Sequence, residues 1–589
     1  MTRLHAGPAL VAVLMALALV QTLQILGGVT PILEGRLIDP DCYMRLDRVR
    51  MLWEGDAWYE SHSLRHNAPF GETLHWTRPL DLLLLPAYAL GGERALWWWG
   101  VAISPVFEML AVLALSFATR PFLSSGGFAL LGVLFVTQAG PAGVFIAGRP
   151  DHHGFLLLLM IAGLAPLLRR VAGDGDRRLP VFAGLVLGLG LWVAVEALAA
   201  YALALAFLGV LWLWRGEDWL DALTSTAKAG AAMVAVALVL ERPPADWLTA
   251  STDRLSIIHL TIVLVSAGAA MALRRLDPRR RRPHWAALAA GASLTILALL
   301  FPELFRPPLA HLPPELGEAW LDDIMERMPL WPGDSEGWRR FVLHFGPMAI
   351  GIPYLLHSLR HGETAMRRLA LVQLIGLAVY FPAALHQVRF APFAEALMVL
   401  PWTQAVLALG RQRLPVGLRA LLTVLLLMGP SLAVTLIARS NRGYAPATPY
   451  DTCPWSDIAP TLAGLPRPNG QPPLVFTTPY PGPELVYRAG VAVIATPYHG
   501  NAPAIVATMR ALMGADDRAL LGLLAERRAN YLLLCRSSRE GQWLESLAGD
   551  NAHKRLMRGQ APPNFTPLAL DARLGGDFVL YTISGWPAP

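Results

Sequence analysis

Long apolar runs separated by short polar stretches dominate the chain from its N-terminus to about residue 437. Most runs hold roughly 17–22 residues, which is the length that an α-helix needs to cross a hydrocarbon core of about 30 Å. The pattern therefore predicts a polytopic α-helical membrane domain over residues 1–437, with 80–92 as a candidate re-entrant segment and 229–240 as the weakest span. About thirteen spans are predicted: 8–28, 96–116, 127–147, 152–168, 180–196, 197–214, 229–240, 257–273, 285–301, 341–357, 369–385, 391–409 and 420–437.

The pattern changes after residue 437. Apolar content falls, Pro, Gly and polar residues become more frequent, and short apolar segments alternate with helical ones. The stretches "PLVFTT", "VAVIAT", "NYLLLC" and "FVLYTI" are typical of buried strands, and "NAPAIVATMRALM" and "RALLGLLAERRA" of helices between them. Residues 438–589 are therefore predicted to form an α/β domain outside the membrane.

Composition supports a membrane protein and limits its covalent cross-links. The 589 residues are 54% hydrophobic and 16% charged, and a mean hydropathy of +0.43 is too high for a soluble chain of this size. The first run lacks a small-x-small cleavage site, so we interpret it as an uncleaved span. Three cysteines are too few for a disulfide framework. Cys535 is predicted to lie in a buried strand, which leaves Cys42 and Cys453 as a candidate pair.

The basic residues predict the orientation of the chain. "RRVAGDGDRR", "RRLDPRRRRPH", "LRHGETAMRR" and "GRQRLPVGLR" occur in alternate connections, which the positive-inside rule places in the cytoplasm. The N-terminus is then cytoplasmic, while loops 29–95 and 302–340 and the C-terminal domain are periplasmic. The run "RRLDPRRRRPH" is better explained as an anchor at anionic lipid than as a patch that binds nucleic acid. We expect a multi-pass protein of the bacterial inner (cytoplasmic) membrane, in contact with membrane lipids.

Acidic residues gather in the predicted outer loops. Asp39 and Asp41 follow the first span, and two carboxylates there can bind a divalent cation, although a solvated loop with an Asp-Pro turn explains them too. Asp151 lies in the tight connection between the third and fourth spans. His153 can complete a D-x-H metal pair, with His152 pointing elsewhere if the backbone is extended. The alternative is that these side chains form hydrogen bonds between helices.

Two more candidates lie on the same predicted face. Glu326 occupies the long loop at 302–340, where it is a candidate catalytic acid or an exposed acid on a short helix. Arg389 lies at an outer corner, where it can donate to a phosphate or pyrophosphate or extend to lipid headgroups. Acids from three loops and one arginine together predict a cation held beside a phosphorylated substrate. Three intramembrane acids with no predicted partner are interpreted as structural polar contacts: Glu108, Glu196 and Glu395.

The order of these motifs resembles the catalytic subunit of bacterial and archaeal oligosaccharyltransferases, which are GT-C membrane glycosyltransferases that use lipid-linked sugars. "DPDCYMR" resembles the D-P-Y-Y-H-M-R motif, and "DHH" is similar to the second acidic motif of the family. "DIMERMP" resembles the T-I-x-E or S-V-S-E motif of the fifth external loop, and "QVRF" the segment whose arginine holds the lipid pyrophosphate. The predicted spans and the C-terminal domain fit the same layout.

The resemblance implies roles for individual residues. Asp39 would contact both metal and acceptor, although alignment on Tyr43 would favour Asp41. Arg389 would bind the donor pyrophosphate. The implied metal ligands are Asp39, Asp151, His153 and Glu326, and the implied catalytic acids are Asp39, Asp41 and Glu326. The cofactor would be Mg²⁺ or Mn²⁺.

One motif of the family is missing. The family's C-terminal domain carries W-W-D-x-G, which reads the Ser or Thr of the acceptor sequon, and residues 438–589 contain no such sequence. The turn "PYHGN" at 497–501 is a candidate for contact with another acceptor or an ordinary turn. Transfer to asparagine is therefore not implied.

The sequence thus predicts a membrane glycosyltransferase. It would move a sugar or oligosaccharide, with inversion, from a polyprenyl-(pyro)phosphate carrier to an extracytoplasmic protein, lipid or polysaccharide. The alternatives are a transporter or flippase for lipid-linked glycans, which should carry repeats and a site near the bilayer midplane, and a non-catalytic assembly subunit.

Overall fold

The computed structural model describes residues 5, 7–55, 57–276, 281–306, 325–440 and 452–585. Within these ranges, eleven helices are long and apolar enough to cross a membrane, and α4 (Ser125–Thr137) and α7 (Arg178–Val193) are shorter apolar helices. The protein is therefore a polytopic α-helical membrane protein, and it carries a C-terminal domain that contains a sheet.

Every predicted span overlaps a helix, including the weakest one at 229–240. The predicted span 127–147 is divided into α4 and α5 (Ala139–Val144), because Gln138 between them has an extended backbone. The other membrane helices are α1 (Gly7–Leu26), α3 (Arg78–Thr119), α6 (His152–Val171), α8 (Leu198–Arg215), α9 (Glu217–Glu241), α10 (Ile257–Arg275), α11 (Arg282–Leu300), α13 (Ser335–His361), α14 (Thr364–His386), α15 (Ala391–Gly410) and α16 (Val416–Ser440).

The candidate re-entrant segment at 80–92 is the first part of α3. This helix begins at Arg78 and is interrupted at Gly91 and Gly92, where Gly92 has φ +61° and ψ −154°. Only glycine adopts that backbone conformation without strain. The two glycines thus divide α3 at a kink into two helical parts, which contain the separately predicted segments 80–92 and 96–116.

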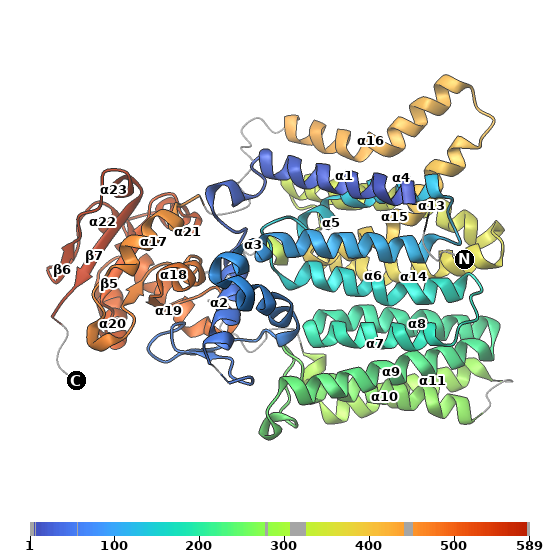
Figure 1. Cartoon of the computed structure of the whole chain (residues 1–589), viewed down its shortest axis with the longest axis horizontal. Coiled ribbons are helices and arrows are strands. Elements are labelled where there is room, and N and C mark those ends of the chain that lie inside the picture. Colours follow the sequence, from blue (N-terminus) through green and yellow to red (C-terminus); the bar gives the residue numbers. More distant parts are fainter. Residues whose placement is uncertain are drawn as a thin grey trace.

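The membrane helices lie side by side in one bundle, and the C-terminal domain lies at one end of it (Figure 1). Helices α7 and α9 pack closely at Gly184, which has no side chain. A Cβ atom at this position would lie 2.2 Å from the carbonyl oxygen of Thr226, so no larger residue fits there without a shift. Small residues permit such close approach between membrane helices. The first turn of α1 lies at the bundle end that is remote from the C-terminal domain (Figure 1).

The segment between α1 and α3 forms the first outer loop. It contains η1 (Pro31–Glu34), α2 (Pro40–Glu54) and the antiparallel pair β1 (His62–Ser63) and β2 (Glu72–Thr73). Asp39 caps the N-terminus of α2 by accepting a hydrogen bond from the Cys42 N–H at 3.1 Å. The Asp-Pro sequence thus begins a helix, with proline in the first turn, where its missing N–H costs nothing.

A buried charge cluster fixes this loop to the bundle. Asp81 of α3 accepts hydrogen bonds from Arg48 at 2.7 and 3.1 Å and from Arg78 at 3.3 Å. Arg45 lies 3.8 Å from the other oxygen of the same carboxylate. All four side chains are buried, so a single acid balances three arginines.

The C-terminal domain contains a five-stranded sheet in the order β4-β3-β5-β7-β6. β3 pairs in parallel with β4 and β5, and β7 is antiparallel to β5 and β6. Phe476 and Leu532 face one apolar cluster while Val475 and Leu533 face the other, which is why the strands are continuous apolar runs. The strands are β3 (Leu474–Phe476), β4 (Ala492–Val493), β5 (Tyr531–Cys535), β6 (Phe565–Pro567) and β7 (Phe578–Ile583).

Four of these strands and two helices lie where the sequence predicts them. β6 was not predicted, because an edge strand of three residues that ends in proline carries little signal. The domain boundary that the sequence places between residues 437 and 438 stays a prediction. Helix α16 continues beyond it to Ser440. The helices are α17 (Trp455–Ala463), α18 (Gly482–Ala489), α19 (Ala502–Met513), α20 (Arg518–Arg527), α21 (Arg539–Ser546), α22 (Ala552–Met557) and α23 (Leu574–Asp577).

The C-terminal domain is bound to the first outer loop. The backbone N–H of Val493 in β4 donates a hydrogen bond to the Arg65 carbonyl, and the Val493 carbonyl accepts one from the Ala68 N–H, each at 2.9 Å. Helix α18 packs on α2, where Arg488 donates to the Tyr43 hydroxyl at 3.0 Å. The domain therefore lies directly beside the acids of the first outer loop.

The cysteine pairing differs from the candidate pair. Cys453 forms a disulfide with Cys535 at the end of β5, and Cys42 is a buried free thiol. The candidate Cys42–Cys453 pair is wrong, because the sulfur of Cys453 is bonded to Cys535 at the end of the buried strand β5, while Cys42 lies in α2 beside Asp39.

We expect thiol titration to reflect this pairing. Denatured, unreduced protein should expose one thiol, since only Cys42 is free, and reduction should expose all three. Cys42→Ser should remove the thiol that reacts before reduction. Three reactive thiols without reductant would contradict the disulfide.

Candidate functional site

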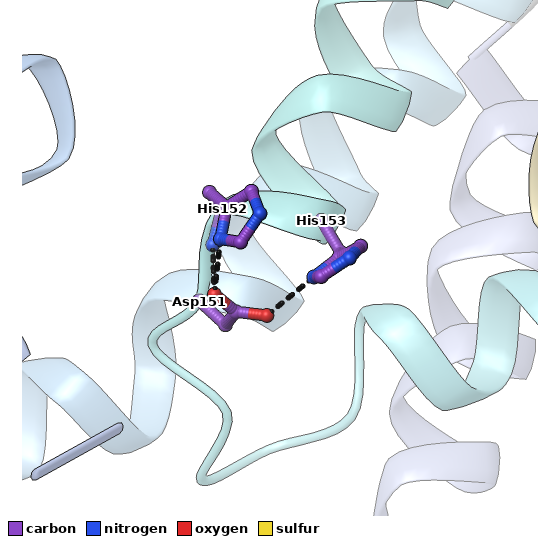
Figure 2. Close-up of side chains that lie close together, drawn as sticks. All are labelled: Asp151, His152 and His153. Atoms are coloured by element: carbon purple, nitrogen blue, oxygen red, sulfur yellow. Dashed lines mark hydrogen bonds and ion pairs between the residues drawn. The ribbon is translucent and has the colours of Figure 1, made fainter. Parts of the chain in front are cut away.

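The centre of the candidate site is the N-terminus of α6. Asp151 caps this helix, accepting a hydrogen bond from the His152 N–H at 2.6 Å. The Nδ1–H groups of His152 and His153 each donate to one of its carboxylate oxygens at 2.6 Å (Figure 2). Burial alone would raise the pKa of Asp151, but the two imidazoles hold it well below its usual range. This carboxylate therefore stays ionised and orients both rings.

The prediction that His152 points elsewhere is wrong. It assumed an extended backbone, whereas both histidines lie in the first turn of α6. Their rings turn back to the capping carboxylate, with centroids 4.2 Å apart. Ligand atoms of Asp151, His152 and His153 all lie within 4.8 Å of one another, so the three residues form a possible metal site.

Arg149 joins this cluster to the other predicted acids. Its guanidinium lies 3.5 Å from Asp39 and 3.8 Å from Asp151, and it forms a close ion pair with Glu326 of η6 (Met325–Arg327). Burial alone would lower the pKa of Arg149, but these carboxylates raise it above its usual value. Asp39, Asp151 and Glu326, from three different loops, thus meet around one cation.

Sequence reasoning did not select Arg149. Its signal was local: the arginine stands between Gly148 and Pro150, two residues before Asp151. A basic residue so close to a predicted metal-binding acid is unusual for a site that needs negative charge.

Asp41 faces the same cluster without joining its ion pairs. Its half-buried carboxylate has no hydrogen bond or ion pair with any residue that the structure describes. Burial raises its pKa well above the usual value, and the negative charges of Asp39, Asp151 and Glu326 add to this rise. Asp39 differs from Asp41, because its carboxylate accepts a hydrogen bond from the Cys42 thiol and forms an ion pair with Arg149.

Glu326 faces His153 as well as Arg149. A carboxylate oxygen of Glu326 lies 3.6 Å from His153 Nε2, which is buried and makes no hydrogen bond in the described structure. Burial opposes ionisation of Glu326, yet His153 and Arg149 lower its pKa below the usual value. The preceding part of the predicted loop, 307–324, lies outside the described residues.

Arg389 lies beside the cluster and not within it. It belongs to η7 (Val388–Phe390), whose Val388 N–H donates to the Met328 carbonyl at 2.9 Å, two residues beyond Glu326. The guanidinium is 29% exposed and lies 3.4 Å from Glu196. Glu196 in turn interacts electrostatically with both histidines of α6.

The intramembrane acids without a predicted partner all have one. Glu196 belongs with Arg389 at the edge of the candidate site. Glu108 accepts a hydrogen bond from Gln21 at 2.9 Å, and Glu395 pairs with His344 at 2.5 Å. The last two are structural contacts between helices, as expected.

No family model and no curated protein sequence matches this chain. Among solved structures it is similar to archaeal oligosaccharyltransferase AglB from Archaeoglobus fulgidus in complex with an inhibitory peptide and a dolichol-phosphate, with TM-score 0.67 and 17% identity, covering 91% of this chain and 72% of that chain. The chain has an oligosaccharyltransferase fold.

Two further solved structures match this chain, one with a TM-score above 0.5 and one below it. The A. fulgidus enzyme in complex with Zn and sulfate matches with TM-score 0.62 and 16% identity over 89% of this chain and 68% of that one. ArnT from Cupriavidus metallidurans bound to undecaprenyl phosphate matches with TM-score 0.45 and 13% identity over 99% of this chain and 98% of that one. The A. fulgidus structures confirm, at the level of the fold, the resemblance inferred from the motifs.

The turn at 497–501 joins the C-terminal domain of this oligosaccharyltransferase fold to two outer loops. His499 of η9 (His499–Asn501) pairs with Asp253 at 3.0 Å, and its ring packs at a tilt against that of His75, with ring centroids 4.6 Å apart. Tyr498 packs edge-on against Trp76 at 4.7 Å. The Tyr498 hydroxyl is buried with no hydrogen-bond partner in the described structure, and burial and the nearby Asp41 raise its pKa well above the usual value.

Proposed function

We propose that this protein is a membrane glycosyltransferase that moves a sugar or oligosaccharide from a polyprenyl-phosphate or polyprenyl-pyrophosphate carrier to an acceptor outside the cytoplasm. The observation that carries the proposal is the convergence of Asp39, Asp151 and Glu326, from three loops, at the bundle end that faces the C-terminal domain. The fold supports it, because AglB, which shares it, binds dolichol-phosphate.

A divalent cation fits the donor set. Asp39, Asp151, His153 and Glu326 would hold it, and His152 adds a nitrogen that the sequence prediction left out. The buried, unpartnered Nε2 of His153 beside Glu326 is a suitable ligand atom. Nitrogen ligands favour Mn²⁺ over Mg²⁺. When bound, such an ion would offset the charge that develops on the leaving phosphate.

The two aspartates of the first outer loop have different proposed roles. Asp39 caps α2 and points to Arg149 and the metal ligands, so it positions the cation. Asp41 has no partner among the described residues and is half-exposed, so it is the carboxylate available to accept a hydrogen bond from the acceptor nucleophile. General bases must lie within hydrogen-bond reach of the proton that they take.

Arg389 is the proposed ligand of the donor phosphate. Within the described structure its guanidinium forms one ion pair, with Glu196, which leaves N–H groups of this partly exposed side chain available to an anion. The donor would then lie between Arg389 and the acids of α6 and η6, with the acceptor on the side of the first outer loop. Attack from that side would invert the anomeric carbon.

The proposed location is the bacterial inner membrane with the C-terminal domain in the periplasm. Helix α6 begins at the candidate site and ends in Arg169 and Arg170, which open the basic "RRVAGDGDRR" connection. The site and this basic loop therefore lie at opposite ends of the helix, as the positive-inside rule requires of an outward-facing site.

Release of polyprenyl phosphate tests the function. Detergent-purified protein, supplied with Mn²⁺ and polyprenyl-linked glycans, should release the carrier phosphate or pyrophosphate, and a chelator should stop the release. If the protein binds the lipid-linked glycan and moves it across vesicle membranes without releasing the carrier, the flippase alternative is correct.

We propose in addition that Tyr498 contacts the acceptor. Tyr498→Phe removes the unpartnered hydroxyl and keeps the ring against Trp76. We expect transfer to fall by about tenfold, the effect of one hydrogen bond of roughly 1.4 kcal/mol, while donor hydrolysis without acceptor is unchanged. Equal loss of transfer and hydrolysis, or no loss of either, would contradict an acceptor role.

A further inference from the structure

Arg149 occupies the place where the three proposed metal-binding carboxylates meet. Its guanidinium forms ion pairs with Glu326, with Asp39 at 3.5 Å and with Asp151 at 3.8 Å. A fourth contact of the guanidinium is the hydrogen bond that Nη1 donates to the Gly143 carbonyl at 3.3 Å. The positive charge of the Arg149 guanidinium therefore offsets the negative charges of acids from three loops.

The backbone of Arg149 is fixed. Its carbonyl accepts a hydrogen bond from the Ser104 hydroxyl and another from the Asp151 N–H at 2.7 Å. Gly148 before it has φ +85°, and a Cβ atom there would lie 2.9 Å from Ile32. Pro150 follows. Any movement of the guanidinium must therefore come from side-chain rotation, and the arginine cannot leave by a shift of its loop.

The guanidinium and a divalent cation cannot share these carboxylates without strong repulsion. Two like charges about 4 Å apart repel strongly in a partly buried site, and a divalent ion doubles this repulsion. Both cations would be neutralised by the same three carboxylates, those of Asp39, Asp151 and Glu326. Binding of one therefore opposes binding of the other.

We propose that Arg149 is an internal counter-cation that competes with the divalent metal ion for Asp39, Asp151 and Glu326. The arginine keeps the three acids together in the metal-free protein and rotates away when the ion binds. It thus sets the metal concentration at which the site is loaded. The inference rests on the metal role in the proposed function, but it concerns metal affinity and not glycosyl transfer.

Manganese titration, followed by the electron paramagnetic resonance of free Mn²⁺, tests the competition on full-length protein in detergent. Arg149→Met removes the charge and keeps a long side chain, and it should lower the Kd for Mn²⁺ by at least about tenfold, which corresponds to 1.4 kcal/mol. Arg149→Lys should stay within about threefold of wild type. Arg149→Gln repeats the test with a polar side chain in case the methionine variant does not fold.

The matched control is Arg65→Met, an arginine of the first outer loop that pairs with Asp47 and not with the candidate metal ligands. Its Mn²⁺ affinity should equal that of wild type. Unchanged or weaker Mn²⁺ binding in folded Arg149→Met or Arg149→Gln would overturn the inference, as would the absence of Mn²⁺ binding from wild type and all variants. Tighter binding in these variants without any glycosyl transfer would sustain the inference and overturn the proposed function.

Discussion

Replacing Asp151 by alanine should lower carrier release by at least about 10²–10³-fold, the loss typical when a preorganised electrostatic group is removed from an active site. The carboxylate caps α6, receives hydrogen bonds from both imidazoles and faces Arg149. Its removal frees the two rings and one proposed metal ligand at once. Outer groups that orient metal-binding histidines alone account for about 10–100-fold in metal affinity or activity.

The measurement compares initial rates of polyprenyl phosphate release between purified wild type and Asp151→Ala at saturating Mn²⁺. Asp516→Ala is the matched control, because Asp516 is an exposed aspartate of the C-terminal domain that pairs only with the neighbouring Arg518 in the described contacts. The control should retain the wild-type rate. Equal release by wild type and Asp151→Ala, with lipid binding intact in both, would refute a catalytic site at α6.

Asp81→Ala should destabilise the folded protein by about 3–5 kcal/mol, the cost of leaving buried charges without their partner. Asp81 is fully buried and balances Arg45, Arg48 and Arg78. Without it, three guanidinium groups between α2 and α3 lose the carboxylate that offsets their desolvation. The same change should loosen α2, whose first residue follows Asp39.

Unfolding of the detergent-solubilised variants in denaturant would measure this loss. Glu93→Ala is the matched control, since Glu93 also pairs with an arginine of α2, Arg50 at 3.2 Å, but its side chain is 57% exposed. Exposed ion pairs contribute about 0–1 kcal/mol, so this variant should unfold close to wild type. A comparable loss of stability in both variants would show that burial of the pair is not the cause.

The proposed metal centre shows where local patterns stop being informative. Asp39, Asp151 and Glu326 were recognisable as acids that follow or precede membrane spans, because hydropathy and chain order fix which bundle end each loop occupies. The roles of His152 and Arg149 were missed. The first depends on whether one residue lies in a helix or an extended segment, and the second on three loops meeting at one guanidinium.

The sequence by itself determined the membrane helices, four of the five strands of the C-terminal domain and the set of candidate acids. These features depend on hydrophobic period and residue type, which are local properties of the chain. Only the tertiary structure decided that Cys453 pairs with Cys535, that Arg389 contacts Glu196 and that Arg149 lies among the acids. Such contacts join residues far apart in the chain, and the packing of whole helices and loops sets their distances, so no short window of sequence encodes them.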